Sequence, residues 1–211
     1  MKTNPFRAFL ARQLGFPTGL FGHLLLKMLN KNNAAMNDLV LQMLKLETGN
    51  RVLEIGFGGG DLIDKIVNTK KPILTVGIER SLDAVTLCQR RFQQIINQNK
   101  LELHLADATK LPLPNDYFNQ ICTVNTIYFW IDTAQVLSEC HRVLIPGGKL
   151  VISYASKAFL EQKKFTQHGF TAYETTQIET ILKAAGFTEI NTISHQDTHH
   201  QQFFCTCAEK R

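Results

Sequence analysis

The stretch Val52-Leu53-Glu54-Ile55-Gly56-Phe57-Gly58-Gly59-Gly60-Asp61-Leu62 decides the fold of the chain. A short apolar run that contains Glu54 leads into a glycine-rich turn, and an amphipathic segment from Asp61 to Val67 follows. The order of strand, glycine turn and helix brings bare backbone close to a ligand at the carboxyl end of a strand. The stretch therefore predicts the ligand-binding turn of an α/β fold.

The spacing of the glycines distinguishes between ligands. A dinucleotide-binding turn needs the pattern G-x-G-x-x-G, and counting from Gly56 its third glycine would fall on Asp61. The chain instead has Glu54 followed by glycines at positions 56, 58 and 60. A carboxylate beside the turn favours a ligand with an ammonium or sulfonium group over a pyrophosphate. A glycine-rich turn that binds no ligand is the alternative.

Strand and helix patterns alternate along the rest of the chain. Strands are expected near 52–55, 73–79, 101–105, 118–124, 149–154, 189–193 and 202–208. Helices are expected near 36–47, 61–67, 81–97, 133–144 and 175–185, and residues 146–148 are expected to form a tight turn. Alternating elements with short connections require a mostly parallel sheet with helices on both faces. The sequence therefore predicts a doubly wound α/β domain.

Three acidic residues fall at the ends of the first three expected strands, where a ligand crosses a doubly wound sheet. Glu79 suits the two hydroxyls of a ribose, and Asp107 with the backbone N–H of Ala108 suits an adenine. Taken alone, Glu79 and Asp107 are equally well explained as a solvated charge or a cap. Together with Glu54 and the glycine turn, they predict a nucleoside site that also receives a cation.

These residues resemble motif I and the strand-end acids of the class I S-adenosylmethionine (SAM) methyltransferases. Asp107 with residues 111–118 is similar to the acidic-loop signature of the small-molecule enzymes, and residues 142–150 and 184–187 resemble two later family motifs. The resemblance covers residues 36–208. It implies a Rossmann-like seven-stranded sheet with an antiparallel last strand, SAM as methyl donor, and cofactor contacts from Glu54, Gly56, Phe57, Gly58, Gly60, Glu79, Arg80, Asp107, Ala108 and Asn125.

The loop from Asn125 to Trp130 faces the transferred methyl group in this family. Its aromatic residues would form an apolar wall that tolerates a cation, with ordinary packing as the alternative. Methyl transfer mainly needs alignment and exclusion of water, and a base only for a poor nucleophile. Tyr128, His168 and Tyr173 are the candidate catalytic groups, each with the alternative of being a wall residue.

The first 37 residues contain five basic residues and no acid, so they carry the whole net charge of +5. Residues 1–35 are expected to form a helical arm or pocket cover in front of a SAM-binding domain at 36–211. Contact of this basic arm with a membrane surface and dimerisation are alternatives, and the sequence leaves the oligomeric state undetermined. The neutral remainder argues against a nucleic-acid partner.

Composition excludes further classes. No apolar run approaches the roughly 20 residues of a membrane span, and the N-terminus lacks a signal pattern, so a cytoplasmic protein is expected. Five scattered cysteines are expected to be free thiols. His195, His199 and His200 lack the supporting ligands of a metal site, so no metal is expected.

The leading prediction is a SAM-dependent methyltransferase that acts on a small-molecule acceptor, with a lipophilic acceptor as one option and the identity of the acceptor left open. A SAM-binding module without catalysis is the first alternative. A nicotinamide-dependent oxidoreductase shares the fold but needs the glycine spacing that this chain lacks.

Overall fold

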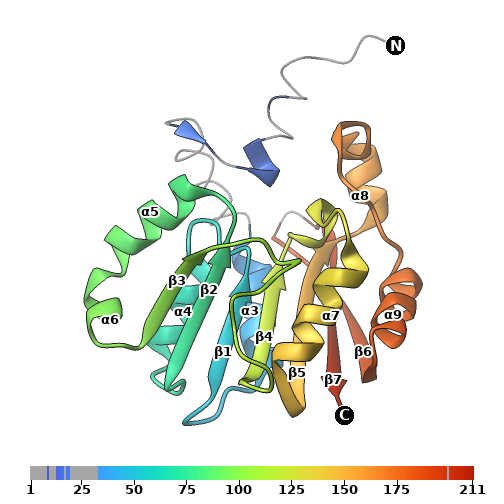
Figure 1. The fold of residues 1–211 in the computed structure, drawn as a ribbon. Helices are drawn as coiled ribbons and strands as arrows, with labels where there is room; N and C mark the ends of the chain where they lie inside the picture. The colour runs from blue at the N-terminus through green and yellow to red at the C-terminus, as the bar shows by residue number, and fades with distance from the viewer. Residues whose placement is uncertain (1–8, 10–12, 17, 20–32, 199) are drawn as a thin grey trace.

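The computed structural model describes residues 9, 13–16, 18–19, 33–198 and 200–211. Within these residues seven strands form one sheet in the order β3-β2-β1-β4-β5-β7-β6 (Figure 1). Neighbouring strands from β3 to β5 are parallel, whereas β7 runs antiparallel to both β5 and β6. The expected sheet with an antiparallel last strand is therefore confirmed. The strands are β1 (Arg51–Ile55), β2 (Leu74–Glu79), β3 (Leu101–Leu105), β4 (Phe118–Val124), β5 (Leu144–Ala155), β6 (Phe187–Gln196) and β7 (Gln202–Lys210).

Helices cover both faces of this sheet (Figure 1). They are α3 (Ala34–Leu44), α4 (Asp61–Asn68), α5 (Leu82–Arg91), α6 (Gln93–Asn97), α7 (Thr133–Val143), α8 (Lys157–Gln162) and α9 (Thr175–Ala184), with the short 3-10 helices η1 (Ile127–Phe129) and η2 (Phe165–His168). The side chain of Ser81 caps α5 by accepting a hydrogen bond from the N–H of Ala84, as the sequence predicts.

The sheet separates two apolar cores, because successive strand residues point to opposite faces. On β1, Val52 packs in a cluster with the buried residues of α3 and α4. Leu53 and Ile55 pack in the larger cluster under α7 and α9. The face that carries Val52 also carries Glu54, so a carboxylate lies inside an otherwise apolar layer. This placement matters for the site described below.

The expected helix at 81–97 is in fact two helices, with a break at Phe92. Phe92 is buried, and its ring lies 2.7 Å from the position that a Cβ on Gly60 would occupy. The chain thus leaves the helical path at the residue whose ring packs under the glycine turn. Helix α7 forms where a helix is expected. Its buried residues include Val136 and Val143, and Ala134 is exposed.

The predicted turn at residues 146–148 lies within a strand. β5 begins at Leu144, which pairs with Phe118, and regular pairing resumes only at Lys149 opposite Gln120. The extra residues form a bulge in which Gly147 has a φ of 77°, a conformation that glycine adopts readily.

Most of the predicted N-terminal arm, residues 1–35, lies outside the described residues. No helix in the described part of the chain is long and apolar enough to cross a membrane. All five cysteines are free thiols, as predicted, and four of them are buried.

Candidate active site

A cavity of about 910 Å³ lies at the carboxyl ends of β1, β2, β3 and β4. Ten of the thirteen residues that the sequence singles out line it: Glu54, Gly56, Phe57, Gly58, Glu79, Arg80, Asp107, Ala108, Asn125 and Tyr128. The fold therefore brings together residues that are up to 74 positions apart in the chain. Gly60, His168 and Tyr173 are not part of the lining.

The glycine turn needs its glycines for two different reasons. Gly56, Gly58 and Gly60 have φ angles of 74°, 50° and 76°, which side-chain-bearing residues rarely adopt. Gly56 and Gly58 line the cavity, where they leave the backbone bare. Gly60 is the N-cap residue of α4 and packs against Phe92. The third glycine is therefore explained by packing, and contact with a ligand is not required to account for it.

Glu54 is a buried carboxyl group with an unused oxygen. The residue is 3% exposed, and its Oε2 accepts no hydrogen bond from the described residues. Burial raises the pKa of Glu54 to about 8, helped by the negative charges of Asp61 and Glu79 and opposed by the N–H of Ile63. A buried polar atom without a partner in a cavity marks a functional position. This one fits a cation that donates a hydrogen bond.

Glu79 fixes the glycine turn against the end of β2. Its Oε1 accepts hydrogen bonds from the N–H groups of Arg80 and Ser81, at 2.8 and 2.9 Å, and its Oε2 accepts one from the N–H of Gly58 at 3.1 Å. A carboxylate has about four acceptor positions, so roughly one remains for a ligand hydroxyl. The bond from Gly58 gives Glu79 a role in holding the turn, which the sequence did not suggest.

Asp107 has one oxygen engaged and one available. Its Oδ1 accepts hydrogen bonds from the N–H and the hydroxyl of Thr109, at 2.8 and 2.7 Å. These two bonds, with the nearby charge of Arg80, hold the pKa of Asp107 below its ordinary value. Its Oδ2 accepts no hydrogen bond from the described residues, so an ionised oxygen can accept one from a ligand amine.

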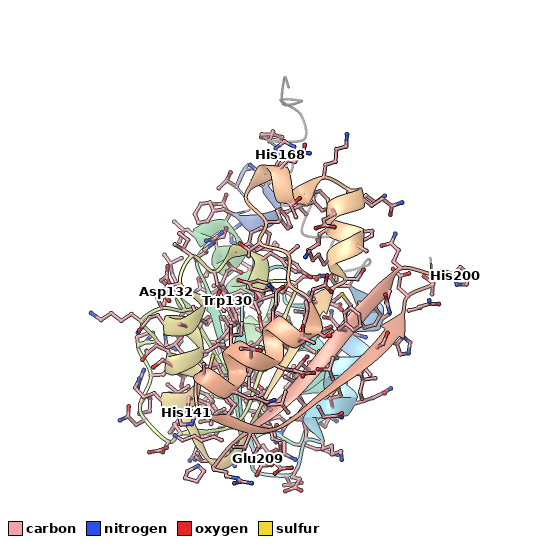
Figure 2. All side chains as sticks on the ribbon, turned by 90° about the vertical axis from the view of Figure 1, so that its right-hand side faces the viewer. Trp130, Asp132, His141, His168, His200 and Glu209 are labelled. Carbon is pink, nitrogen blue, oxygen red and sulfur yellow. The ribbon has the colours of Figure 1, made fainter. Side chains whose placement is uncertain are left out.

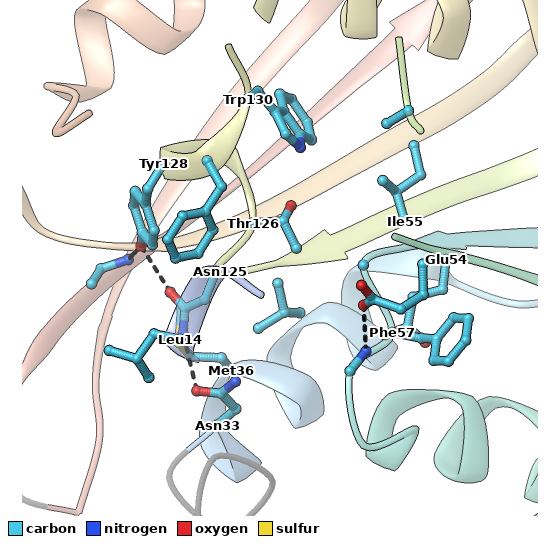
Figure 3. Close-up of a pocket in the computed structure, with 18 of the residues that line it drawn as sticks. Leu14, Asn33, Met36, Glu54, Ile55, Phe57, Asn125, Thr126, Tyr128 and Trp130 are labelled. Carbon is cyan, nitrogen blue, oxygen red and sulfur yellow. Dashed lines mark hydrogen bonds between the residues drawn. The ribbon is translucent and has the colours of Figure 1, made fainter. Parts of the chain in front are cut away.

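Tyr128 is held between two partners. Its buried hydroxyl oxygen accepts a hydrogen bond from the N–H of Ala155, and the hydroxyl donates to Oδ1 of Asn125 at 2.8 Å (Figure 3). Asn125 in turn donates from Nδ2 to Oδ1 of Asn33 at 3.0 Å and to Sδ of Met36 at 3.2 Å. Burial raises the pKa of Tyr128 far above its ordinary value. This geometry favours a positioning role for Tyr128 over the role of a base.

The two other candidate catalytic groups lie elsewhere. Tyr173 shares a hydrogen bond of 3.1 Å with the hydroxyl of Thr133. His168 ends η2 near the top of the molecule, and Figure 2 shows it well above Trp130. A base role for either group would require the segment that follows α8 to move.

Aromatic rings form the wall of the cavity near Tyr128. The ring of Phe170 lies 5.8 Å from Tyr128, 4.5 Å from Phe129 and 5.0 Å from Phe165, measured between centroids. Phe165 and Phe170 follow α8, and neither is predicted from the sequence, because nothing in their local pattern distinguishes a cavity wall from a packed core. Asn33 is not predicted from the sequence either.

The described part of the N-terminal segment lies at the rim of the cavity. Leu14 and Gly15 belong to the lining. Arg80 donates hydrogen bonds from Nε and Nη2 to the carbonyl oxygen of Gly15, at 3.1 and 2.5 Å. The Arg80 guanidinium also lies 5.7 Å from the ring of Phe16 and 5.9 Å from the ring of Phe129. Arg80 therefore connects this segment to the rim.

Known methyltransferases resemble this chain in sequence. Residues 53–152 match the family described as methyltransferase domain. The chain is 26% identical over 179 residues to the uncharacterized methyltransferase YdaC of Bacillus subtilis, an alignment that covers 84% of this chain and 93% of YdaC. It is 33% identical over 100 residues to a fatty-acid O-methyltransferase of Mycolicibacterium smegmatis, covering 47% of this chain but only 35% of that enzyme.

The fold is also shared with solved structures. A chain from the complex of the Haloferax volcanii Trm112 methyltransferase activator with a methyltransferase has a TM-score of 0.75 at 16% identity, covering 85% of this chain and 92% of that one. At this identity the likeness concerns the fold. The matched methyltransferase domain, the alignment with YdaC and the shared fold together support the identification of the chain as a class I SAM-dependent methyltransferase.

Proposed function

We propose that the cavity holds SAM against β1, β2 and β3 and a small apolar acceptor against the aromatic wall. The observation that carries the cofactor half is the unused, buried Oε2 of Glu54. A carboxyl oxygen in that state destabilises the ligand-free protein, and an ammonium group is the partner that would satisfy it. The amino-acid end of SAM carries such a group.

The other strand-end residues fit the remaining parts of SAM. Glu79 keeps about one acceptor position for a ribose hydroxyl, and Oδ2 of Asp107 is available to the adenine amine. Asn125 and Tyr128 lie on the neighbouring loop, which would place them near the transferred methyl group. SAM supplies a methyl group on a sulfonium, which is already a good leaving group. The protein's own contribution is alignment of the acceptor and exclusion of water.

The acceptor half of the cavity is apolar. Its wall includes Tyr128, Phe129, Trp130, Phe159, Phe165 and Phe170. Burial of aromatic and aliphatic surface against such rings favours a lipophilic acceptor. The described lining contains no histidine, lysine or cysteine. Outside the proposed cofactor residues its carboxylates are Asp61, Asp132 and Asp197, and each accepts a hydrogen bond from the protein. These features support an acceptor whose nucleophile ionises easily or needs no proton removal, such as a carboxylic acid or an acidic phenol.

The N-terminal segment would cover this cavity. The contacts of Arg80 with Gly15 and Phe16 support that role, because they fix described parts of the segment at the rim. An apolar acceptor reacts best when water is excluded, and a cover serves that purpose.

Calorimetric titration of the full chain tests the cofactor half. S-adenosylhomocysteine (SAH), the product of methyl transfer, is expected to bind with micromolar-range affinity, whereas NAD gives no binding heat. Folded protein that binds neither SAM nor SAH would disprove the proposal.

A transfer assay tests the acceptor half. The protein is incubated with SAM that is radiolabelled in its methyl group and with separate panels of fatty acids, acidic phenols and polar amines. Label is expected in the solvent-extracted products of the apolar acids or phenols. Label in the polar amines alone would show that the aromatic wall does not select the acceptor. A Glu54→Ala variant serves as the control for transfer without the cofactor site.

A further inference from the structure

We propose that Asn33 binds the methionine carboxylate of SAM, and that a hydrogen-bond relay from Tyr128 fixes the side-chain N–H of Asn33 toward the cavity. The inference rests on the proposed binding of SAM and adds a residue that precedes the matched domain at 53–152. It makes Asn33 a binding residue and Tyr128 a positioning residue.

The relay has a direction because both of its ends are chemically unambiguous. The N–H of Ala155 can only donate, so the hydroxyl oxygen of Tyr128 accepts from it. The sulfur of Met36 can only accept, so the atom of Asn125 that lies 3.2 Å from it must be the amide nitrogen. The amide oxygen of Asn125 therefore faces Tyr128, which donates to it.

The same logic orients Asn33. The amide nitrogen of Asn125 donates to Asn33 at 3.0 Å, so the atom of Asn33 that receives this bond is its oxygen (Figure 3). The Nδ2 of Asn33 then remains as the free end of the relay, without a hydrogen bond to any described residue. Because Asn33 lines the cavity, this donor is available to a bound molecule.

Asn33 differs in this respect from the other asparagines of the lining. Asn37 donates its Nδ2 to Oδ2 of Asp61 at 2.9 Å, and Asn125 donates to Asn33 and Met36. Both amides are thus committed to protein partners. Of the three asparagines that line the cavity, Asn33 is the one whose N–H groups have no described partner.

A chain of contacts also links Asn33 to the position proposed for the ammonium group. It comes one helical turn before Asn37, whose N–H bonds the carbonyl oxygen of Asn33. Asn37 contacts Asp61, and the charge of Asp61 contributes to the raised pKa of Glu54. The ammonium and carboxylate of an amino acid are attached to one carbon. An amino acid whose ammonium group bonds Glu54 therefore holds its carboxylate close to the same position.

The chemistry of an amide suits this carboxylate. A hydrogen bond to a charged acceptor is stronger than one between neutral groups. A neutral donor also adds no positive charge beside the sulfonium, which a lysine or arginine would do. The unused oxygen of Glu54 and the unused nitrogen of Asn33 together form a clamp for a zwitterionic amino-acid group.

Calorimetry with two nucleosides tests the clamp. SAH carries the amino-acid group, whereas methylthioadenosine has the same adenosine and sulfur without it. Asn33→Ala is expected to weaken SAH binding about tenfold or more, as the loss of a charged hydrogen bond should. The affinity for methylthioadenosine should not change. Asn33→Asp should weaken SAH binding further, because it faces one carboxylate with another.

Two further variants sharpen the test. Tyr128→Phe leaves Asn125 free to rotate its amide, so it should weaken binding of SAH more than that of methylthioadenosine. Asn68→Ala removes an exposed amide that bonds Asp64 on the last turn of α4 and is not part of the cavity lining, so it should leave both affinities unchanged.

The outcomes separate this inference from the proposed function. If the unmodified protein does not bind SAH, the SAM site itself is wrong. If it binds SAH and Asn33→Ala changes neither affinity, the role of Asn33 is refuted. Equal losses for SAH and methylthioadenosine would also refute it, because they would show a structural effect on the whole cavity.

Discussion

Replacing Glu54 by glutamine should stabilise the ligand-free protein above neutral pH. The pKa of Glu54 is raised from 4.5 to about 8 in the folded protein. Between these values the folded protein keeps a proton that the unfolded chain releases, so the free energy of unfolding falls as the pH rises. Below pH 4.5 the ionisation of Glu54 does not change the free energy of unfolding. Above pH 8 the full cost of holding the buried carboxylate in its charged form is present. That cost is on the order of 5 kcal/mol.

Urea unfolding of the ligand-free protein measures this effect. The free energy of unfolding is compared at pH 5 and pH 8.5 for the unmodified protein and for Glu54→Gln. Other titrating groups are common to both proteins and cancel in the comparison. The variant should lose less stability between the two pH values, by up to the cost given above. The same pH dependence in both proteins would refute the assigned ionisation of Glu54.

The same proton should appear in ligand binding. At pH 7 a group with a pKa near 8 holds about 0.9 of a proton. An ammonium group that bonds Glu54 favours the ionised form, so SAH binding should release close to one proton at this pH. Calorimetric titrations in phosphate and in Tris buffer measure the release from the difference in binding enthalpy. An enthalpy that is independent of the buffer would contradict the proposed contact.

Three other substitutions test the site and its support. Glu79→Ala should weaken SAM binding by about 2 kcal/mol in calorimetry, and unchanged affinity would place the ribose elsewhere. Tyr128→Phe should lower the free energy of unfolding by about 1–3 kcal/mol, because the N–H of Ala155, which is half-buried, loses its acceptor. Its pH–rate profile should keep its shape, and a lost basic limb would restore Tyr128 as a base. Gly60→Ala should lower the thermal midpoint, because the new Cβ meets Phe92 at 2.7 Å and φ is 76°; an unchanged midpoint would show that the ring moves aside.

The acidic residues on the cofactor side of the site could be predicted from the sequence because each lies at or just after the end of a strand. Glu54, Glu79 and Asp107 are found by locating strand ends, and parallel strands place their carboxyl ends on one edge of the sheet. That reasoning needs no side-chain positions. It failed to show that Glu79 already bonds Gly58, because such a contact depends on the path of the turn.

The acceptor side and the position of Asn33 could not be predicted in the same way. His168 and Tyr173 are plausible from residue type alone, but their positions depend on the path of the segment between β5 and α9. Asn33 lies 92 positions from Asn125, and only the packing of α3 beside β4 brings their amides together. The break at Phe92 has a similar origin, since a ring packed beneath Gly60 overrides the local preference for helix.

The strand order has a consequence for the synthesis of the protein on the ribosome. β7 is made after β6, yet it lies between β5 and β6 and is the strand that joins β6 to the sheet. While residues up to 196 are emerging, β6 has no strand with which to pair, and the edge of β5 is exposed. Nascent chains arrested before residue 202 should therefore bind chaperones. Premature stop codons in this region should produce insoluble protein even though every residue of the cofactor site has already been translated.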